Sequence, residues 1–131
     1  MLKLIEQFAK MVAKLLNLDY VSEPQLFTEN FDELLKSYFK LSPDELSMLL
    51  TEDEKRDALL LDENSKNSQL SLFARAGIAY ISNNDFEKAK ICLKIIERIE
   101  QEHQGLFEFP NPERQKIHDE IDELRKKTKT S

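Results

Sequence analysis

The sequence predicts a single all-α domain, a compact helical bundle of about seven helices. Three observations support this. The chain has only two glycines and no tryptophan in 131 residues, and it combines 40% hydrophobic with 34% charged residues, a balance that suits closely spaced helices. Apolar residues recur three and four positions apart along most of the chain. A chain of this length has room for one hydrophobic core.

Residues 1–61 are expected to form an N-terminal helical half, which begins with a helix over residues 2–18. The apolar residues of this helix cover about half of its circumference, which is typical of a helix that packs against two neighbours. They are Leu4, Ile5, Phe8, Met11, Val12, Leu15 and Leu16. The alternative is a lysine-edged helix that lies on a membrane surface.

Three shorter helices complete this half. Ser22, Glu23 and Pro24 are expected to open the first, since serine caps free N–H groups and proline is tolerated in the first turn. Its apolar positions are Phe27, Phe31, Leu34, Leu35 and Tyr38. The pattern Ser42–Glu45 is a capping box that begins a helix through residue 50, and Thr51–Glu54 repeats it for a helix that ends near residue 61.

The second half contains a helical hairpin. Residues 62–69 are polar, show no periodicity and are predicted to be a linker. A helix over residues 69–81 is apolar on nearly every side except around Ser71 and Arg75, which indicates a central position. A turn at residues 83–85 leads to a helix over residues 86–102, with Asn84 as the expected cap.

The last predicted helix covers residues 112–127 and follows a loop over residues 105–112, in which Asn111 is the expected cap. Its apolar stripe is narrow and consists of Ile117, Ile121 and Leu124. Such a stripe suits a lid on the outside of the fold or a seam for self-association. Residues 128–131 are expected to be disordered.

Gly77 stands in the middle of the apolar helix 69–81, where glycine costs about 1 kcal/mol relative to alanine. A neighbouring helix that approaches closely would explain it. In an antiparallel hairpin, Gly77 and Ala89 are the small residues expected at the closest approach of the two axes.

The hairpin resembles a tetratricopeptide repeat, a helix-turn-helix unit of 34 residues. The resemblance covers residues 70–101 of the predicted hairpin 70–103, although Ile96 replaces the usual alanine and Gln101 the usual proline. The matching residues are Ala76, Gly77, Tyr80, Phe86, Ala89 and Leu93. The opening segment also looks like an uncharacterised bacterial family of short all-helical proteins, which implies a bacterial cytoplasmic protein but no activity.

In tetratricopeptide repeats the first helix lines a peptide-binding groove. The corresponding positions here are Ser71, Ala74, Ile78, Ile81 and Ser82, which are mostly apolar. An apolar groove is not expected to face water, so we predict that the first helix or the helices of residues 24–61 fill it. A partner's helix or a second subunit is the alternative occupant.

The charge distribution limits the classes of partner. The chain carries a formal charge of −6, and residues 19–64 hold thirteen acids against four bases, which disfavours nucleic acid as a partner. The basic end of the chain, Arg125, Lys126, Lys127 and Lys129, complements the dipole of the last helix or contacts an acidic region of another copy. Neither a secretion signal nor a membrane span is predicted, and membrane association is disfavoured.

No catalytic, cofactor or metal site is predicted. Cys92 lies on an apolar helix face and is expected to be a buried hydrophobe, while His118 and Asp122 are four apart on a solvated face. His103 is expected to cap helix carbonyls. The sequence therefore predicts a scaffold or protein interaction module without enzymatic activity, whose partner is an unidentified protein or a second copy. The alternatives are a peripheral membrane protein and a domain that binds a small ligand or a metal.

Overall fold

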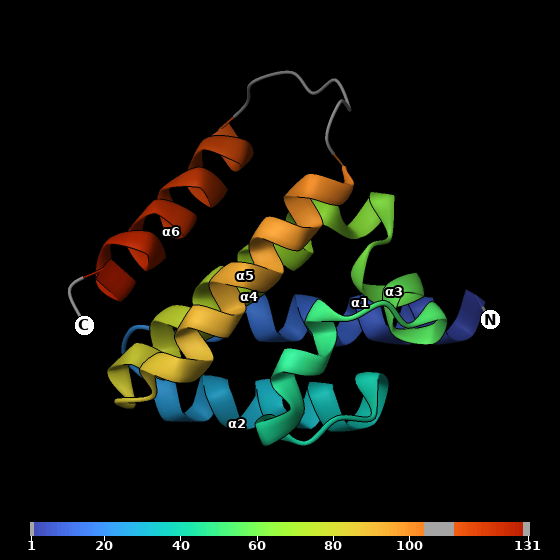
Figure 1. The fold of residues 1–131 in the computed structure, drawn as a ribbon, viewed down its shortest axis with the longest axis horizontal. Helices are drawn as coiled ribbons and strands as arrows, with labels where there is room; N and C mark the ends of the chain where they lie inside the picture. Colours follow the sequence, from blue (N-terminus) through green and yellow to red (C-terminus); the bar gives the residue numbers. More distant parts are fainter. Residues whose placement is uncertain (1, 104–111, 130–131) are drawn as a thin grey trace.

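The structure is all-α, as predicted. The computed structural model describes residues 2–103 and 112–129, and within these ranges it contains helices and no strands (Figure 1). In chain order the elements are α1 (Leu2–Leu16), α2 (Pro24–Leu34), η1 (Leu35–Phe39), η2 (Pro43–Leu50), α3 (Glu54–Leu60), η3 (Glu63–Ser65), α4 (Lys66–Ser82), α5 (Phe86–Glu102) and α6 (Pro112–Lys129). The π-helical turn η1 continues α2 directly, and η3 leads into α4, so the seven predicted helical segments are all present.

Helix α4 is the centre of the bundle. It packs against α5, α6, α2 and α1, and every residue from 69 to 80 except Arg75 is buried. Figure 1 shows α5 in front of α4, α6 beside this pair, and α1 and α2 below. The nearly uniform apolar character of α4 follows from this position, because neighbours cover it on all sides.

Among the residues that the structure describes, five phenylalanines are fully buried, and one pair of them connects the two halves of the chain. The ring of Phe31 in α2 packs edge-on against the ring of Phe73 in α4, with centroids 5.5 Å apart. The ring of Phe8 in α1 packs in the same way against that of Phe39, at 5.4 Å. Edge-to-face pairs of this kind contribute about 0.5–1.5 kcal/mol beyond the area that they bury.

A cluster of polar and charged side chains around Arg75 joins α1, α4 and α6. Arg75 of α4 donates from Nε to Glu120 Oε2 of α6 at 2.7 Å and from Nη1 to the carbonyl oxygen of Leu16 in α1 at 2.7 Å. Ser71 Oγ donates to the other carboxylate oxygen of Glu120 at 2.8 Å. The Tyr20 ring lies 5.3 Å from the guanidinium carbon, so the arginine is also in cation–π contact. This cluster fixes α1 and α6 against α4.

The capping box at Ser42 is confirmed, since the Glu45 carboxylate accepts the Ser42 N–H at 3.0 Å. This hydrogen bond lowers the pKa of Glu45. The predicted N-caps of three other helices were wrong by one or two residues, and at two of these helices a nearby aspartate accepts a first-turn N–H instead. The observed N-caps are Glu23 instead of Ser22, Asp53 instead of Thr51, and Asp85 instead of Asn84.

Two segments are more helical than predicted. Residues 62–69 are not a linker, because η3 and the first turn of α4 occupy them. Helix α6 continues to Lys129, so residues 128 and 129 are ordered helix, contrary to prediction. The predicted loop 105–112 and the expected cap Asn111 lie outside the described residues, apart from Pro112.

Gly77 does permit a close approach, but to a different neighbour from the one predicted. A Cβ atom at this position would lie 2.8 Å from both Cδ atoms of Leu124 in α6 and 3.3 Å from Cβ of Cys92 in α5. Ala89 is buried but is not among these nearest contacts. The glycine therefore serves a meeting point of three helices, with α6 as the nearest neighbour, and the residue facing it from α5 lies one turn beyond Ala89.

Candidate functional site: an acidic groove

The predicted groove of α4 is not an open binding surface. Ser71, Ala74 and Ile78 are buried within the chain, and Ile81 is partly buried. Helix α6 takes part in covering them, since Ser71 hydrogen-bonds to Glu120, whereas the sequence predicted that only the N-terminal half would do so. Ser82 is exposed at the end of the helix.

The apolar face of α1 is also largely used inside the protein. Phe8, Val12 and Leu15 are buried, whereas Leu4 and Ile5 remain exposed near the start of the helix. None of the described helices combines the length and the apolar character needed to cross a membrane.

The histidines and the cysteine lie in different environments. His118 is exposed on α6, and His103 is buried at the end of α5. Cys92 is fully buried, as predicted, and burial raises the pKa of its thiol far above the ordinary value. In the part of the chain that the structure describes, no group of three or more His, Cys, Asp or Glu side chains converges as a metal site requires.

The surface also has a shallow, open depression between α3 and α5, which we call the acidic groove. It consists of two adjoining depressions of about 570 Å³ each, which share Glu52, Arg98 and Glu102. Its lining contains six acids and two bases, together with apolar and amide side chains. The residues are Leu50, Glu52, Asp53, Glu54, Asp57, Ala58, Leu61, Lys94, Glu97, Arg98, Gln101 and Glu102.

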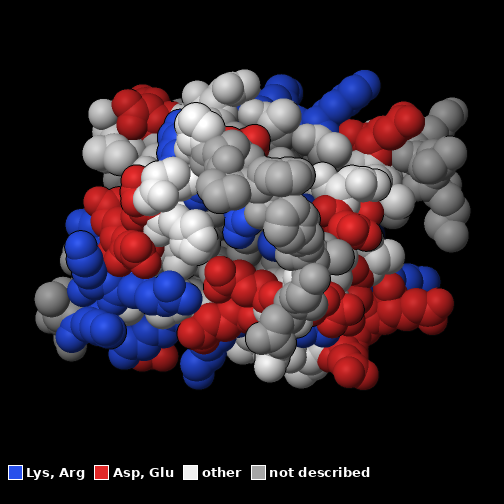
Figure 2. Space-filling view, turned by 90° about the horizontal axis from the view of Figure 1, so that it is seen from above, with Lys and Arg blue, Asp and Glu red and all other residues white. Residues whose placement is uncertain are grey.

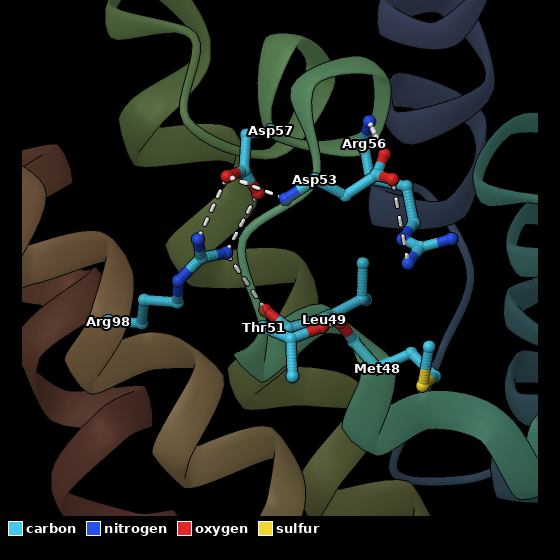
Figure 3. A network of polar contacts seen from close by, with 7 residues as sticks. All are labelled: Met48, Leu49, Thr51, Asp53, Arg56, Asp57 and Arg98. Carbon is cyan, nitrogen blue, oxygen red and sulfur yellow. Dashed lines mark hydrogen bonds and ion pairs between the residues drawn. The ribbon is translucent and has the colours of Figure 1, made fainter.

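Arg98 connects the elements that form the acidic groove (Figure 3). Its two Nη atoms donate to the two carboxylate oxygens of Asp57 at 2.9 Å, and Nη1 also donates to the carbonyl oxygen of Leu49 at 2.9 Å. The arginine of α5 is thus attached both to η2 and to α3. A paired guanidinium and carboxylate of this geometry are stronger and more directional than a single-contact ion pair.

The start of α3 belongs to the same network. Asp53 caps the helix by accepting the Arg56 N–H at 2.9 Å, and its own N–H donates to Asp57 at 3.3 Å (Figure 3). The hydrogen bond from Arg98 lowers the pKa of Asp57, and the same contact raises the pKa of Arg98. The two charges therefore stay paired, and Arg98 offers little net positive charge to a ligand in the groove.

On the face that Figure 2 shows, acidic side chains gather at the lower centre and right and basic ones at the lower left, while further acidic side chains lie at the left edge and further basic ones at the upper right. Sequence reasoning missed the groove itself, because it assigned the acids near residue 53 to helix capping and did not pair α3 with α5.

The chain was compared with protein-family models, curated proteins and solved structures, and none of the three comparisons found a match. The resemblance of residues 70–101 to a tetratricopeptide repeat, and that of the opening segment to a bacterial family, remain predictions from the sequence. Candidate functions are therefore argued from the geometry and charge of the acidic groove.

Proposed function

We propose that this chain is a protein interaction module without enzymatic activity, and that the acidic groove binds a basic, amphipathic segment of a partner protein. The observation that carries the proposal is the charge of the lining, with six acids against two bases, of which Arg98 is already paired with Asp57. Complementary charge of this kind speeds association and selects the partner.

Apolar side chains in the lining support an amphipathic segment. Leu50 and Leu61 line its two depressions and are partly buried, so they offer apolar contacts between the carboxylates. A segment with lysine or arginine on one side and leucine on the other matches both features.

Fluorescence anisotropy with a labelled helical peptide of lysine and leucine tests the proposal, with a glutamate and leucine peptide of the same length as control. The basic peptide should bind, and raising the salt concentration should weaken it. The double variant Glu52→Gln/Glu102→Gln should bind roughly two- to thirtyfold more weakly, since each ion pair lost at a surface contributes about 0.2–1 kcal/mol. Equal binding of both peptides would refute the proposal.

A matched control is Glu29→Gln/Glu33→Gln, which removes two exposed acids of α2 outside the groove. It lowers the net negative charge by the same amount, so an equal loss of affinity would also contradict the assignment to the groove. Light scattering of the protein alone tests whether a second copy supplies the segment through its exposed Lys126 and Lys129. A dimer that dissociates in salt would identify that partner.

A further inference from the structure

Helix α6 is attached to the bundle along one side only. It packs mainly on α4 and α5, and Figure 1 shows it beside this pair, at the edge of the molecule. Charged side chains along its other side are exposed to solvent, among them Lys116, Asp119, Asp122, Glu123 and Lys126. Because these positions are not covered, α6 can leave its place without displacing another described element.

The buried side of α6 combines a narrow apolar stripe with one charged side chain. The stripe consists of Ile117, Ile121 and Leu124. The charged side chain is Glu120, whose two carboxylate oxygens accept hydrogen bonds from Arg75 Nε at 2.7 Å and from Ser71 Oγ at 2.8 Å, both in α4. The attachment of α6 therefore depends on a small number of specific contacts.

The surface of α4 that α6 covers needs a helix of this kind. Without Glu120, the largely buried guanidinium of Arg75 would lose its carboxylate partner, which is strongly destabilising because the charge is left uncompensated. Gly77 leaves room for Leu124, since a Cβ atom at this position would lie 2.8 Å from both Cδ atoms of that leucine. A helix that replaces α6 must therefore bring a carboxylate to Arg75 and, four residues later, a leucine to Gly77.

We infer that this surface of α4 and α5 accepts α6 from a second copy of the chain, so that two copies exchange these helices. The second copy is the favoured occupant because its α6 brings Glu120 and Leu124 at the required spacing. Arg75 of each copy then pairs with Glu120 of the other copy. The exchanged and the closed form contain the same contacts at this surface, and such swapping is a low-cost route to a dimer. The inference does not depend on peptide binding in the acidic groove.

Two charge-reversed variants of the full chain test the inference. Arg75→Glu and Glu120→Arg each place like charges at the contact between α4 and α6, so each alone should unfold at a lower urea concentration than the unchanged chain. In an equimolar mixture, exchange of α6 restores opposite charges at both contacts. Light scattering of the mixture should therefore show a dimer with twice the 15.4 kDa mass of one chain. The mixture should also unfold at a higher urea concentration than either variant alone.

Three controls assign the effect to α6. The double variant Arg75→Glu/Glu120→Arg restores opposite charges within one chain, so it should match the unchanged chain in mass. The pair Asp57→Arg and Arg98→Asp reverses the contact between α3 and α5, in which α6 takes no part, so its mixture should gain no dimer. Adding Glu52→Gln/Glu102→Gln to the first mixture should leave the dimer unchanged, which separates it from association through the acidic groove.

Hydrogen exchange of the unchanged chain gives a measurement that does not depend on the folding of a variant. Since α6 must leave its place before it is exchanged, its slowest amides should exchange about tenfold or more faster than those of α4, through a local opening. The inference is overturned if both helices exchange at the same rate, or if the first mixture forms no dimer while the double variant is folded. A dimer of equal amount from the Asp57 and Arg98 variants would also overturn it.

Discussion

Gly77 provides the sharpest test of the packing, because two opposing effects act on its replacement by alanine. In an exposed helix the change would stabilise the protein by about 1 kcal/mol through helix propensity. Here the new Cβ would lie 2.8 Å from both Cδ atoms of Leu124, which is itself fully buried. Overpacking of a core costs about 1–3 kcal/mol. Gly77→Ala should therefore lower the free energy of unfolding by about 0–2 kcal/mol.

The effect of Gly77→Ala on stability should change from destabilising to stabilising when Leu124 is shortened. Leu124→Ala alone should cost about 2–5 kcal/mol, because it leaves a cavity. In that background Gly77→Ala meets only the Cys92 contact at 3.3 Å, so it should stabilise the protein by up to about 1 kcal/mol. The double-mutant cycle should then give a coupling energy of about 1–3 kcal/mol.

Urea unfolding followed by circular dichroism at the helix band measures all four proteins. A second cycle with Ile117→Ala is the control, since Ile117 lies seven residues from Leu124, about 10 Å along α6. Substitutions that do not touch add to within about 0.5 kcal/mol. Additivity in the Leu124 cycle would refute the close packing of α6 on Gly77.

Four further outcomes are expected. Arg98→Met should lower the free energy of unfolding, measured in urea, by up to about 3–5 kcal/mol, because it leaves the Asp57 carboxylate without its partner. Because the pKa of Asp57 is lower in the folded protein than in the unfolded chain, its carboxylate stabilises the fold above the unfolded-state pKa, and this stability is lost as the pH falls through the folded-state pKa. Asp57→Asn should therefore make the decline of stability in acid less steep. Burial raises the pKa of Asp32, so its ionised carboxylate lowers stability at neutral pH and this penalty disappears as the carboxyl is protonated in acid. Asp32→Asn should therefore be least destabilising, or even stabilising, at neutral pH and more destabilising in acid. Native Cys92 should react with a thiol reagent only at the rate of unfolding, and fast labelling would contradict its burial.

Helical periodicity was sufficient to predict the fold class and the order of the segments. Phe27, Phe31 and Leu34 recur at helical spacing and are buried, and the uniformly apolar helix α4 is buried from residue 69 to residue 80 except at Arg75, as expected. Helix starts were less predictable, because several neighbouring side chains compete to accept the same first-turn N–H groups. Asp53 and Asp85 win this competition over Thr51 and Asn84.

The acidic groove could not be predicted for a different reason. It lies between helices that are distant in the sequence, and periodicity indicates which face of a helix is buried but not which helix covers it. The lid position that the sequence predicted for α6 shows the same limitation. Its stripe of Ile117, Ile121 and Leu124 indicated the correct buried face, but the contact with Gly77 needed the three-dimensional arrangement.

The cluster around Arg75 has a consequence for how the chain is made in the cell. The guanidinium and the Ser71 hydroxyl lie in the central helix, yet the carboxylate that they share comes from Glu120, which is 45 residues after Arg75 in the chain. Until that residue leaves the ribosome, the nascent chain has no α6 to cover Gly77 and no counter-charge from Glu120 for the arginine. Folding of α4 into its final environment therefore waits for α6, and a product truncated before Glu120 should be recognised by chaperones and proteases as incomplete.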